Sequence, residues 1–170
     1  ANRVTERSPF ALLKTGQTTP YGPGSDGDLQ TGTAQSFTDN GDGTITDNRT
    51  GLMWEKKSDD DSIHDKDNLY WWCADDDFNF FCDNNFGLMD GTLRTEFLAA
   101  LNAGGGFAGY TDWRLPNINE LQSLTNFDLI NPAAFPAFNS NCGDLSTGNP
   151  GCTIATCSCA GGFFWSSTFG

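Results

Sequence analysis

The amino-acid sequence predicts an α+β domain that combines a β-meander with hairpins, two short helices and long disulfide-stapled loops. Three observations predict it: alternating β-branched residues between turn signals, two short helical patterns, and six cysteines in a Gly-rich chain. At 170 residues, with fourteen Phe and five Trp, the chain is about one domain long and has the apolar side chains for a packed core.

The charge of the chain excludes some partners. Asp and Glu number 22 against nine Lys and Arg, which gives a formal net charge of −13. Such a surface repels phosphate backbones and anionic membrane faces, so we expect no nucleic-acid partner. No apolar run approaches the roughly 20 residues that span a bilayer, so we expect no membrane insertion. We also expect Ala1 to follow a removed signal peptide.

The cysteines predict an oxidising compartment. Cys157 and Cys159 are one residue too close for a zinc knuckle, and the single histidine, His64, is far from them in the sequence. Disulfides are therefore favoured over metal thiolates, and they imply a secreted or periplasmic protein. Six cysteines allow many pairings, and Cys73 with Cys82 and Cys142 with Cys152 are the local candidates. The full set is Cys73, Cys82, Cys142, Cys152, Cys157 and Cys159.

The chain divides into an arm and a domain. Residues 1–35 are polar and contain turn signals, which predicts an arm lying over the domain surface. Residues 36–170 form the domain. It carries an acidic, aromatic insertion at 57–91 and a cysteine-rich tail at 142–159.

Residues 36–57 predict the β-meander. The turn at 40–43 has Asn and Gly residues that accept positive φ, and the strand at 44–46 alternates β-branched side chains. A second turn at 48–51 leads into the third strand at 52–54.

The same segment invites a calcium interpretation. Asp39, Asp42 and Asp47 are oxygen ligands spaced around glycines. An EF-hand register fails at both ends, where Thr38 and Arg49 occupy ligand positions. Turn chemistry is therefore favoured, and a metal site at the three Asp residues remains the alternative.

The insertion at 57–91 also has two interpretations. One is a solvated acidic face over a small satellite core. The other is a binding surface on which aromatic rings stack on sugars and carboxylates hold hydroxyl groups or calcium. The candidate ligand-binding residues are Tyr70, Trp71, Trp72, Asp75, Asp76 and Asp77, of which Asp75 and Asp77 are also candidate metal ligands.

The clearest helical pattern covers residues 92–103. Thr92 is the expected N-cap, and the glycines at 104–106 end the helix. The apolar stripe consists of Phe97, Leu98 and Leu101. We expect this face to pack on a sheet.

A strand, a proline hinge and a capped helix are predicted for residues 109–124, which read GYTDWRLPNINELQSL. Asn117 and Glu120 have capping-box spacing, and Arg114 is the expected charge partner of Glu120. The role predicted for this stretch is architectural. The candidate structural residues of the chain are Trp54, Trp113, Arg114, Pro116, Asn117, Glu120 and Trp165.

Three sequence blocks carry a family resemblance: TDNGDGTITDNRTGLMWEK, AGYTDWRLPNINELQSL and the terminal FFWSST. In this order, with a helix before the second block, they resemble the family named after the C-terminal domain of the Legionella collagen-like protein. The resemblance implies a secreted or surface-displayed bacterial domain without a catalytic residue set. The WRLP block is also similar to C-type-lectin-like domains, which implies a C-type-lectin-like fold.

These observations lead to two functional hypotheses. The first is an extracellular adhesin domain that binds a glycan or a cell-surface polymer, with calcium as the candidate cofactor. The family's namesake binds sulfated polysaccharide, but a charge of −13 opposes that ligand. The alternative is a homo-oligomeric subunit of a fibre, pilus or sheath, assembled by strand or arm exchange. An enzyme is not expected, because His64 lies in a polar stretch and no catalytic motif is present.

Overall fold

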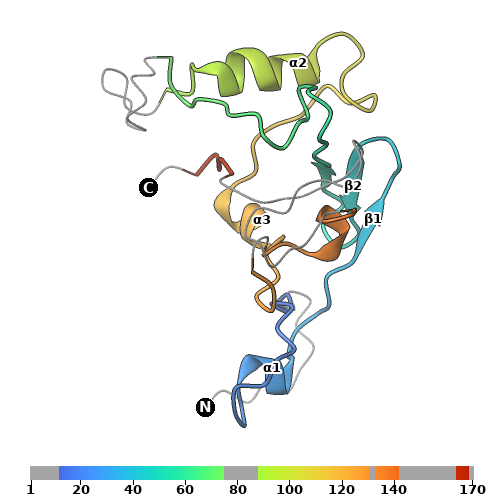
Figure 1. Cartoon of the computed structure of the whole chain (residues 1–170), viewed down its shortest axis with the longest axis vertical. Coiled ribbons are helices and arrows are strands. Elements are labelled where there is room, and N and C mark those ends of the chain that lie inside the picture. The colour runs from blue at the N-terminus through green and yellow to red at the C-terminus, as the bar shows by residue number, and fades with distance from the viewer. Residues whose placement is uncertain (1–11, 75–87, 131–132, 142–163, 169–170) are drawn as a thin grey trace.

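The computed structural model describes residues 12–74, 88–130, 133–141 and 164–168. A small antiparallel sheet and a few short helices fit the predicted α+β class, and the C-type-lectin-like fold stays a prediction. The sheet lies near the middle of the molecule, with α2 and α1 toward opposite ends (Figure 1). In chain order the elements are α1 (Asp26–Leu29), β1 (Phe37–Asp39), β2 (Thr44–Asp47), β3 (Met53–Glu55), η1 (Leu93–Leu98), α2 (Ala99–Asn102), α3 (Ile118–Gln122) and η2 (Pro136–Phe138).

The predicted β-meander is confirmed. The strands pair antiparallel in the order β1, β2, β3, with Thr38 opposite Thr46 and Ile45 opposite Trp54. Ile45 is fully buried because it lies on the central strand. Gly43 ends the first turn at a φ of +88°, a conformation that glycine adopts without steric cost.

The long predicted helix forms, but its first half is a π-helix. η1 continues directly into α2, and the Ala99 N–H bonds to the Arg94 carbonyl five residues back. The helix packs its apolar side against the WRLP segment and the aromatic residues before it. The buried core residues there are Leu93, Phe97, Leu101 and Leu115.

The start of this helix differs from the prediction. Thr92 makes no side-chain cap, and its hydroxyl instead accepts a hydrogen bond from the Trp71 N–H at 2.9 Å. The competing partner lies 21 residues away in sequence, so the local pattern could not reveal it. The predicted end is close to the observed one, since the helix ends at Asn102 and the glycines follow.

The predicted strand before Pro116 is wrong, because residues 112–117 belong to no strand of the sheet. The side chain of Asn102 replaces the missing neighbour strand. Its Oδ1 accepts from the Trp113 N–H at 2.8 Å, and its Nδ2 donates to the Trp113 carbonyl at 2.9 Å. Both backbone groups of Trp113 are therefore satisfied without a β-ladder.

The capping box at α3 is confirmed. Asn117 Oδ1 accepts from the Glu120 N–H at 2.9 Å, and Glu120 Oε2 accepts from the Asn117 N–H at 2.8 Å. Arg114 is the charge partner of Glu120, as predicted, with two N–H donors at 2.9 and 2.7 Å. The Arg114 hydrogen bonds, together with the Asn117 N–H, lower the pKa of Glu120 to about 2.

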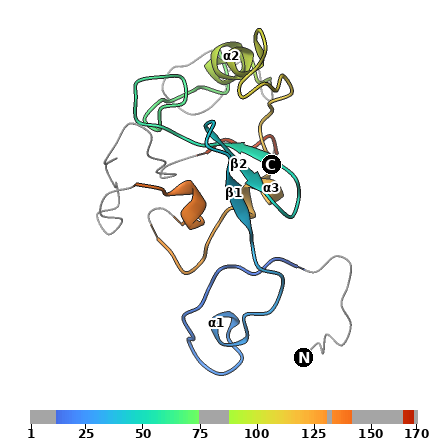
Figure 2. The ribbon, with the colours of Figure 1, turned by 90° about the vertical axis from the view of Figure 1, so that its right-hand side faces the viewer.

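Residues 12–34 form a lobe at one end of the molecule (Figures 1 and 2). The sequence had predicted an arm that lies over the domain surface. The lobe is attached to the domain through the segment after α3. The Phe127 N–H donates to the Thr15 carbonyl, and Asp128 accepts from the Thr18 hydroxyl and the Thr19 N–H. The Thr18 hydrogen bond is the main cause that lowers the pKa of Asp128 to about 2.

Cys73 is buried and disulfide-bonded. Its predicted partner Cys82 lies outside the described residues, as do the other cysteines and the tail at 142–159. The pairings of the six cysteines therefore stay predictions.

Candidate functional site

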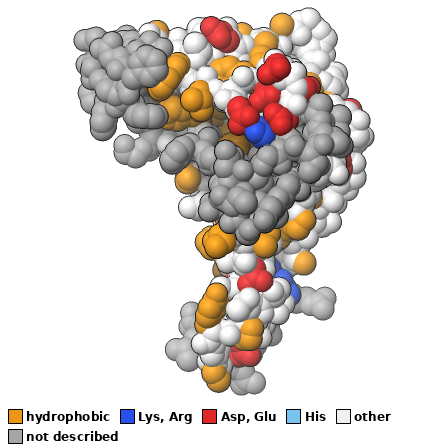
Figure 3. Space-filling view, viewed as in Figure 1, with side chains coloured by type: hydrophobic (Ala, Val, Ile, Leu, Met, Phe, Trp, Pro, Cys, Tyr) orange, Lys and Arg blue, Asp and Glu red, His pale blue; other side chains and the backbone are white. Residues whose placement is uncertain are grey.

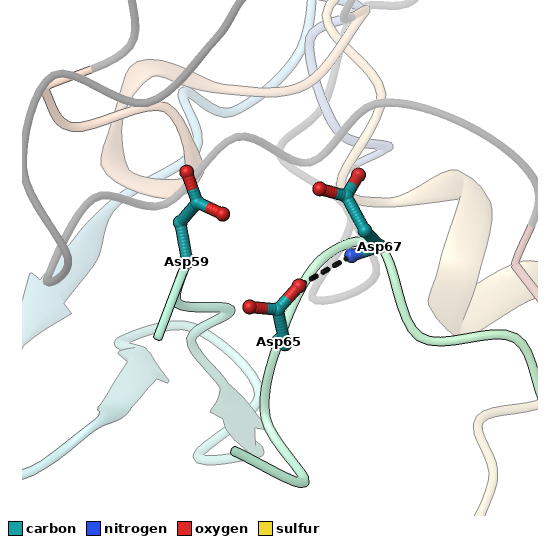
Figure 4. A group of neighbouring side chains, drawn as sticks. All are labelled: Asp59, Asp65 and Asp67. Atoms are coloured by element: carbon teal, nitrogen blue, oxygen red, sulfur yellow. Dashed lines mark hydrogen bonds between the residues drawn. The ribbon is translucent and has the colours of Figure 1, made fainter. Parts of the chain in front are cut away.

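The first part of the site is a tight acidic loop formed by residues 58–68, called the acidic loop below. It is organised around Asp65, whose side chain is buried. Asp65 Oδ2 accepts from the N–H groups of Asp60 and Asp61 at 2.8 and 2.9 Å, and Oδ1 accepts from the Asp67 N–H at 2.8 Å (Figure 4). These backbone donors, with that of Asp67 first, lower the pKa of Asp65 although burial opposes the shift.

Three carboxylates of this loop come together. One oxygen each from Asp59, Asp65 and Asp67 lies within 4.8 Å of the others, and Figure 4 shows the three side chains around a common space. No other group of this kind occurs in the part of the chain that the structure describes. Lys66 Nζ lies 2.6 Å from Asp67 Oδ2 and 3.9 Å from Asp59 Oδ1, so an ammonium group neutralises part of this charge.

His64 ties the acidic loop to the sheet and the core. Its Nδ1 lies 2.8 Å from Glu55 Oε1 on β3, and its ring packs on Phe107 with a centroid distance of 4.2 Å. His64 therefore has an apolar neighbour, although it lies in a polar stretch of the sequence. The contact with Phe107, 43 positions further along the chain, is one that the polar sequence around His64 does not reveal.

The second part of the site, called the aromatic edge below, consists of Leu69, Tyr70, Trp72, Phe164 and Trp165. The Trp72 and Trp165 ring centroids lie 5.8 Å apart, and Trp165 Nε1 donates to the Tyr70 carbonyl at 2.8 Å. Trp165 is 39% exposed and Leu69 is 82% exposed, so apolar surface of this edge faces solvent. Such exposed rings beside polar groups are typical of ligand-binding surfaces.

The acidic loop and the aromatic edge are directly connected. Asn68 Nδ2 donates to the Ser62 carbonyl at 2.7 Å and lies 3.4 Å from the Tyr70 hydroxyl. The Tyr70 hydroxyl itself donates to the Ile63 carbonyl at 3.1 Å. Figure 3 shows acidic side chains gathered around a basic one, with hydrophobic surface on the same face of the molecule. The acidic loop and the aromatic edge are therefore linked through Asn68 and Tyr70.

A C-terminal segment, residues 164–168, joins this surface to the WRLP block. The Ser167 N–H donates to the Pro116 carbonyl at 2.7 Å, and Thr168 Oγ1 accepts from the Ile118 N–H at 2.9 Å. The sequence predicts a structural role for Trp165. Because Trp165 is partly exposed, it is also a candidate ligand-binding residue. Its contact with Tyr70, 95 positions away in the sequence, could not be predicted from the sequence.

The predicted aromatic residues Tyr70, Trp71 and Trp72 make different contacts in the structure. Tyr70 is half-buried, and its ring packs on Phe97 at a centroid distance of 4.8 Å. The Trp71 N–H is bound to Thr92, and Trp72 lies against Trp165. Tyr70 and Trp72 both pack against the core cluster, and Trp72 also belongs to the aromatic edge through its contact with Trp165. The other predicted ligand-binding residues, Asp75, Asp76 and Asp77, lie outside the described residues.

The side chains of Asp39, Asp42 and Asp47 accept hydrogen bonds from residues of the turns between the strands. Asp39 accepts from the Gly41 N–H and pairs with Lys56 at 2.5 Å. Asp42 Oδ1 accepts from the N–H and hydroxyl of Thr44, and Asp47 accepts from two groups of the next turn. The structure does not gather these three carboxylates into one cluster. This arrangement favours the turn interpretation over a metal site.

Comparison with known families gives one result. The model of the Lcl C-terminal domain family matches residues 43–169, most of the chain. The chain belongs to the Lcl C-terminal domain family. The matched part includes the acidic loop, the aromatic edge and α3, whereas residues 12–42 precede it. No curated protein and no solved structure matches the chain.

Family membership gives the cellular context. An Lcl C-terminal domain is a surface or secreted bacterial domain, so this chain has an extracellular, surface-associated role. Within the described ranges, the structure contains no helix that is both long enough and apolar enough to span a bilayer.

Proposed function

We propose that the acidic loop and the aromatic edge together bind a glycan or another hydroxylated cell-surface polymer, as an adhesin domain does. The observation that carries this proposal is the exposed ring of Trp165, packed on Trp72 beside a loop of carboxylates. Aromatic faces stack on the apolar C–H faces of sugar rings, and carboxylates accept hydrogen bonds from sugar hydroxyl groups. Both kinds of group are present on one surface.

The charge of this surface narrows the ligand class. Residues 58–68 contain five Asp residues and one Lys, so the loop keeps an excess of negative charge. This charge repels sulfated and other anionic polymers. We therefore propose a neutral polysaccharide as the ligand of this member of the family.

Calcium is proposed to assist ligand binding at residues 75–77, which follow Trp72 of the aromatic edge in the sequence. Asp75 and Asp77 carry this part of the proposal, because closely spaced carboxylates are the ligands that calcium prefers. A bound cation would reduce the repulsion between these carboxylates and offer coordination positions to sugar hydroxyl groups. Catalysis is not part of the proposal.

A glycan and polysaccharide array tests the proposal. The oxidised protein is applied once in calcium and once in EDTA, with Trp165→Ala as the test variant and Tyr21→Ala as the control. Tyr21 is 78% exposed but lies on the distant N-terminal lobe, so its loss should leave binding intact. Binding to neutral glycans that Trp165→Ala abolishes supports the proposal. No binding in either buffer, or equal loss in both variants, contradicts it.

A subunit role in an extracellular fibre is the second candidate, favoured by the N-terminal lobe. This lobe projects from the domain and exposes three large apolar side chains, Leu12, Tyr21 and Leu29. Exposed apolar side chains on a projecting element are suited to contact with another subunit. A fibre subunit should elute as polymers without any ligand, whereas a lone adhesin domain should elute as a monomer or closed oligomer.

A further inference from the structure

The three carboxylates of Asp59, Asp65 and Asp67 lie close enough to chelate a metal ion, yet the chain supplies its own cation there. Lys66 Nζ contacts Asp67 Oδ2 at 2.6 Å and lies 3.9 Å from Asp59 Oδ1. The Lys66 side chain is only 12% exposed, although lysine side chains usually extend into solvent. The loop therefore holds the ammonium group, and does not merely pass near it.

We infer that Lys66 is the resident cation of the acidic loop, and that its ammonium group takes the place among these carboxylates that a divalent ion would need. Loop 58–68 is then organised without calcium. This inference does not depend on glycan binding, and it differs from the proposed calcium role of Asp75 and Asp77, which lie elsewhere in the sequence.

The hydrogen bonds of Asp65 support this assignment. Both of its oxygens already accept backbone N–H groups, from Asp60 and Asp61 on one oxygen and from Asp67 on the other. Calcium requires six to eight oxygen ligands at about 2.3–2.6 Å, so it would compete with these donors. A calcium ion would also be repelled by the positive charge of Lys66, which lies beside Asp67 and Asp59.

The inference predicts what happens when the cation is removed. Lys66→Met keeps a long apolar stem but leaves the clustered carboxylates without their cation. Like charges then repel across less than 4.8 Å, and the vacated space becomes available to a divalent ion. The variant should therefore acquire a calcium dependence that exceeds that of the wild type.

The test measures the melting temperature of both proteins in EDTA and in about 10 mM calcium, a concentration about 10 to 100 times the dissociation constant of weak extracellular sites. Calcium should raise the melting temperature of Lys66→Met by about 3–10 °C more than that of the wild type. Lys56→Met is the matched control. Lys56 pairs with the single carboxylate of Asp39, so its removal should lower stability without any added calcium response.

Equal calcium responses of Lys66→Met and the wild type would overturn the inference. Lys66→Arg keeps the positive charge and should respond to calcium as the wild type does. A second measurement needs no destabilised variant: the ¹⁵Nζ signal of Lys66 in the wild type, assigned with Lys66→Arg, should keep its position during a calcium titration. A shift that saturates with calcium would show that the ion displaces Lys66, and would also overturn the inference.

Discussion

Replacing Asn102 by Ala tests the most unusual contact of the fold, the side chain that substitutes for a β-strand. Asn102 Oδ1 accepts from the Trp113 N–H, and Nδ2 donates to the carbonyls of Trp113 and Leu98, all at 2.8–2.9 Å. Alanine removes all of these bonds. It also leaves both backbone groups of Trp113 without a partner next to the core.

The magnitude follows from these bonds. Each hydrogen bond contributes about 1 kcal/mol net, and a buried polar group left without a partner costs about 1–3 kcal/mol. Water reaches the half-buried Trp113 and offsets part of this loss, so we expect a decrease in unfolding free energy of about 2–3 kcal/mol. For a chain of this length, that corresponds to a melting temperature lower by roughly 5–10 °C.

Urea unfolding, followed by far-ultraviolet circular dichroism, measures the difference. Asn48→Ala is the control, because Asn48 is exposed and its side chain bonds only the side chains of Thr38 and Ser36. Its effect should stay within about 0.5 kcal/mol. Asn102→Asp should cost at least as much as Asn102→Ala at neutral pH, since its carboxylate faces two carbonyl oxygens. A cost below about 0.5 kcal/mol for Asn102→Ala would refute the strand-replacement reasoning.

Further predictions concern the ion pair, the core and the aromatic edge. The pKa of Glu120 is lowered from 4.5 to about 2 by Arg114, so the pair stabilises the fold above about pH 4.5 and loses this effect as pH falls toward 2. Arg114 is 57% exposed, so solvent screening limits the effect to about 1 kcal/mol. In urea titrations, the unfolding free energies of Glu120→Gln and the wild type should differ at pH 7 and converge near pH 2. A difference that persists at pH 2 contradicts this prediction. Phe97→Ala should lower the unfolding free energy by about 3–5 kcal/mol in the same assay, because it opens a cavity in the core. Leu29→Ala on the exposed lobe should lower it little. Equal decreases for the two variants would show that the core lies elsewhere. Trp165→Phe removes the indole hydrogen bond but keeps an aromatic ring. It should lower the unfolding free energy by about 1 kcal/mol and retain glycan binding. Lost binding with unchanged stability would show that the indole N–H itself contacts the ligand.

Local chemistry made part of the fold predictable. The β-meander follows from turns whose glycines adopt positive φ and from strands that alternate, and both signals lie within a few residues. The capping box of Asn117 and Glu120 lies within four residues and fixes the start of α3 in the same way. These elements need no information from distant parts of the chain.

Other elements depend on partners that sequence distance hides. Residues 113–115 alternate as a strand does, but Asn102 satisfies the Trp113 backbone, so no sheet forms there. Thr92 has the right residue type for an N-cap, yet Trp71 takes its hydroxyl. In both cases a tertiary hydrogen bond overrides a local propensity.

The candidate site was predictable in composition and not in arrangement. The insertion at 57–91 signalled aromatic rings among carboxylates, and Trp72 of this insertion lies against Trp165. The sequence did not reveal that Trp165 completes this surface from the far end of the chain, nor that Lys66 lies among the acidic side chains. Both depend on how loops fold back, which no periodicity encodes.

The most direct test of the proposed binding surface is an NMR titration of the protein labelled with ¹⁵N-tryptophan. A neutral oligosaccharide such as cellohexaose, or the strongest glycan from the array, is added while the five indole N–H signals are followed. The proposal predicts saturable shifts for Trp72 and Trp165, with Trp54 on β3 and Trp113 beside α2 unchanged. Shifts confined to Trp54 and Trp113, or no shift with any array ligand, would contradict the placement of the site.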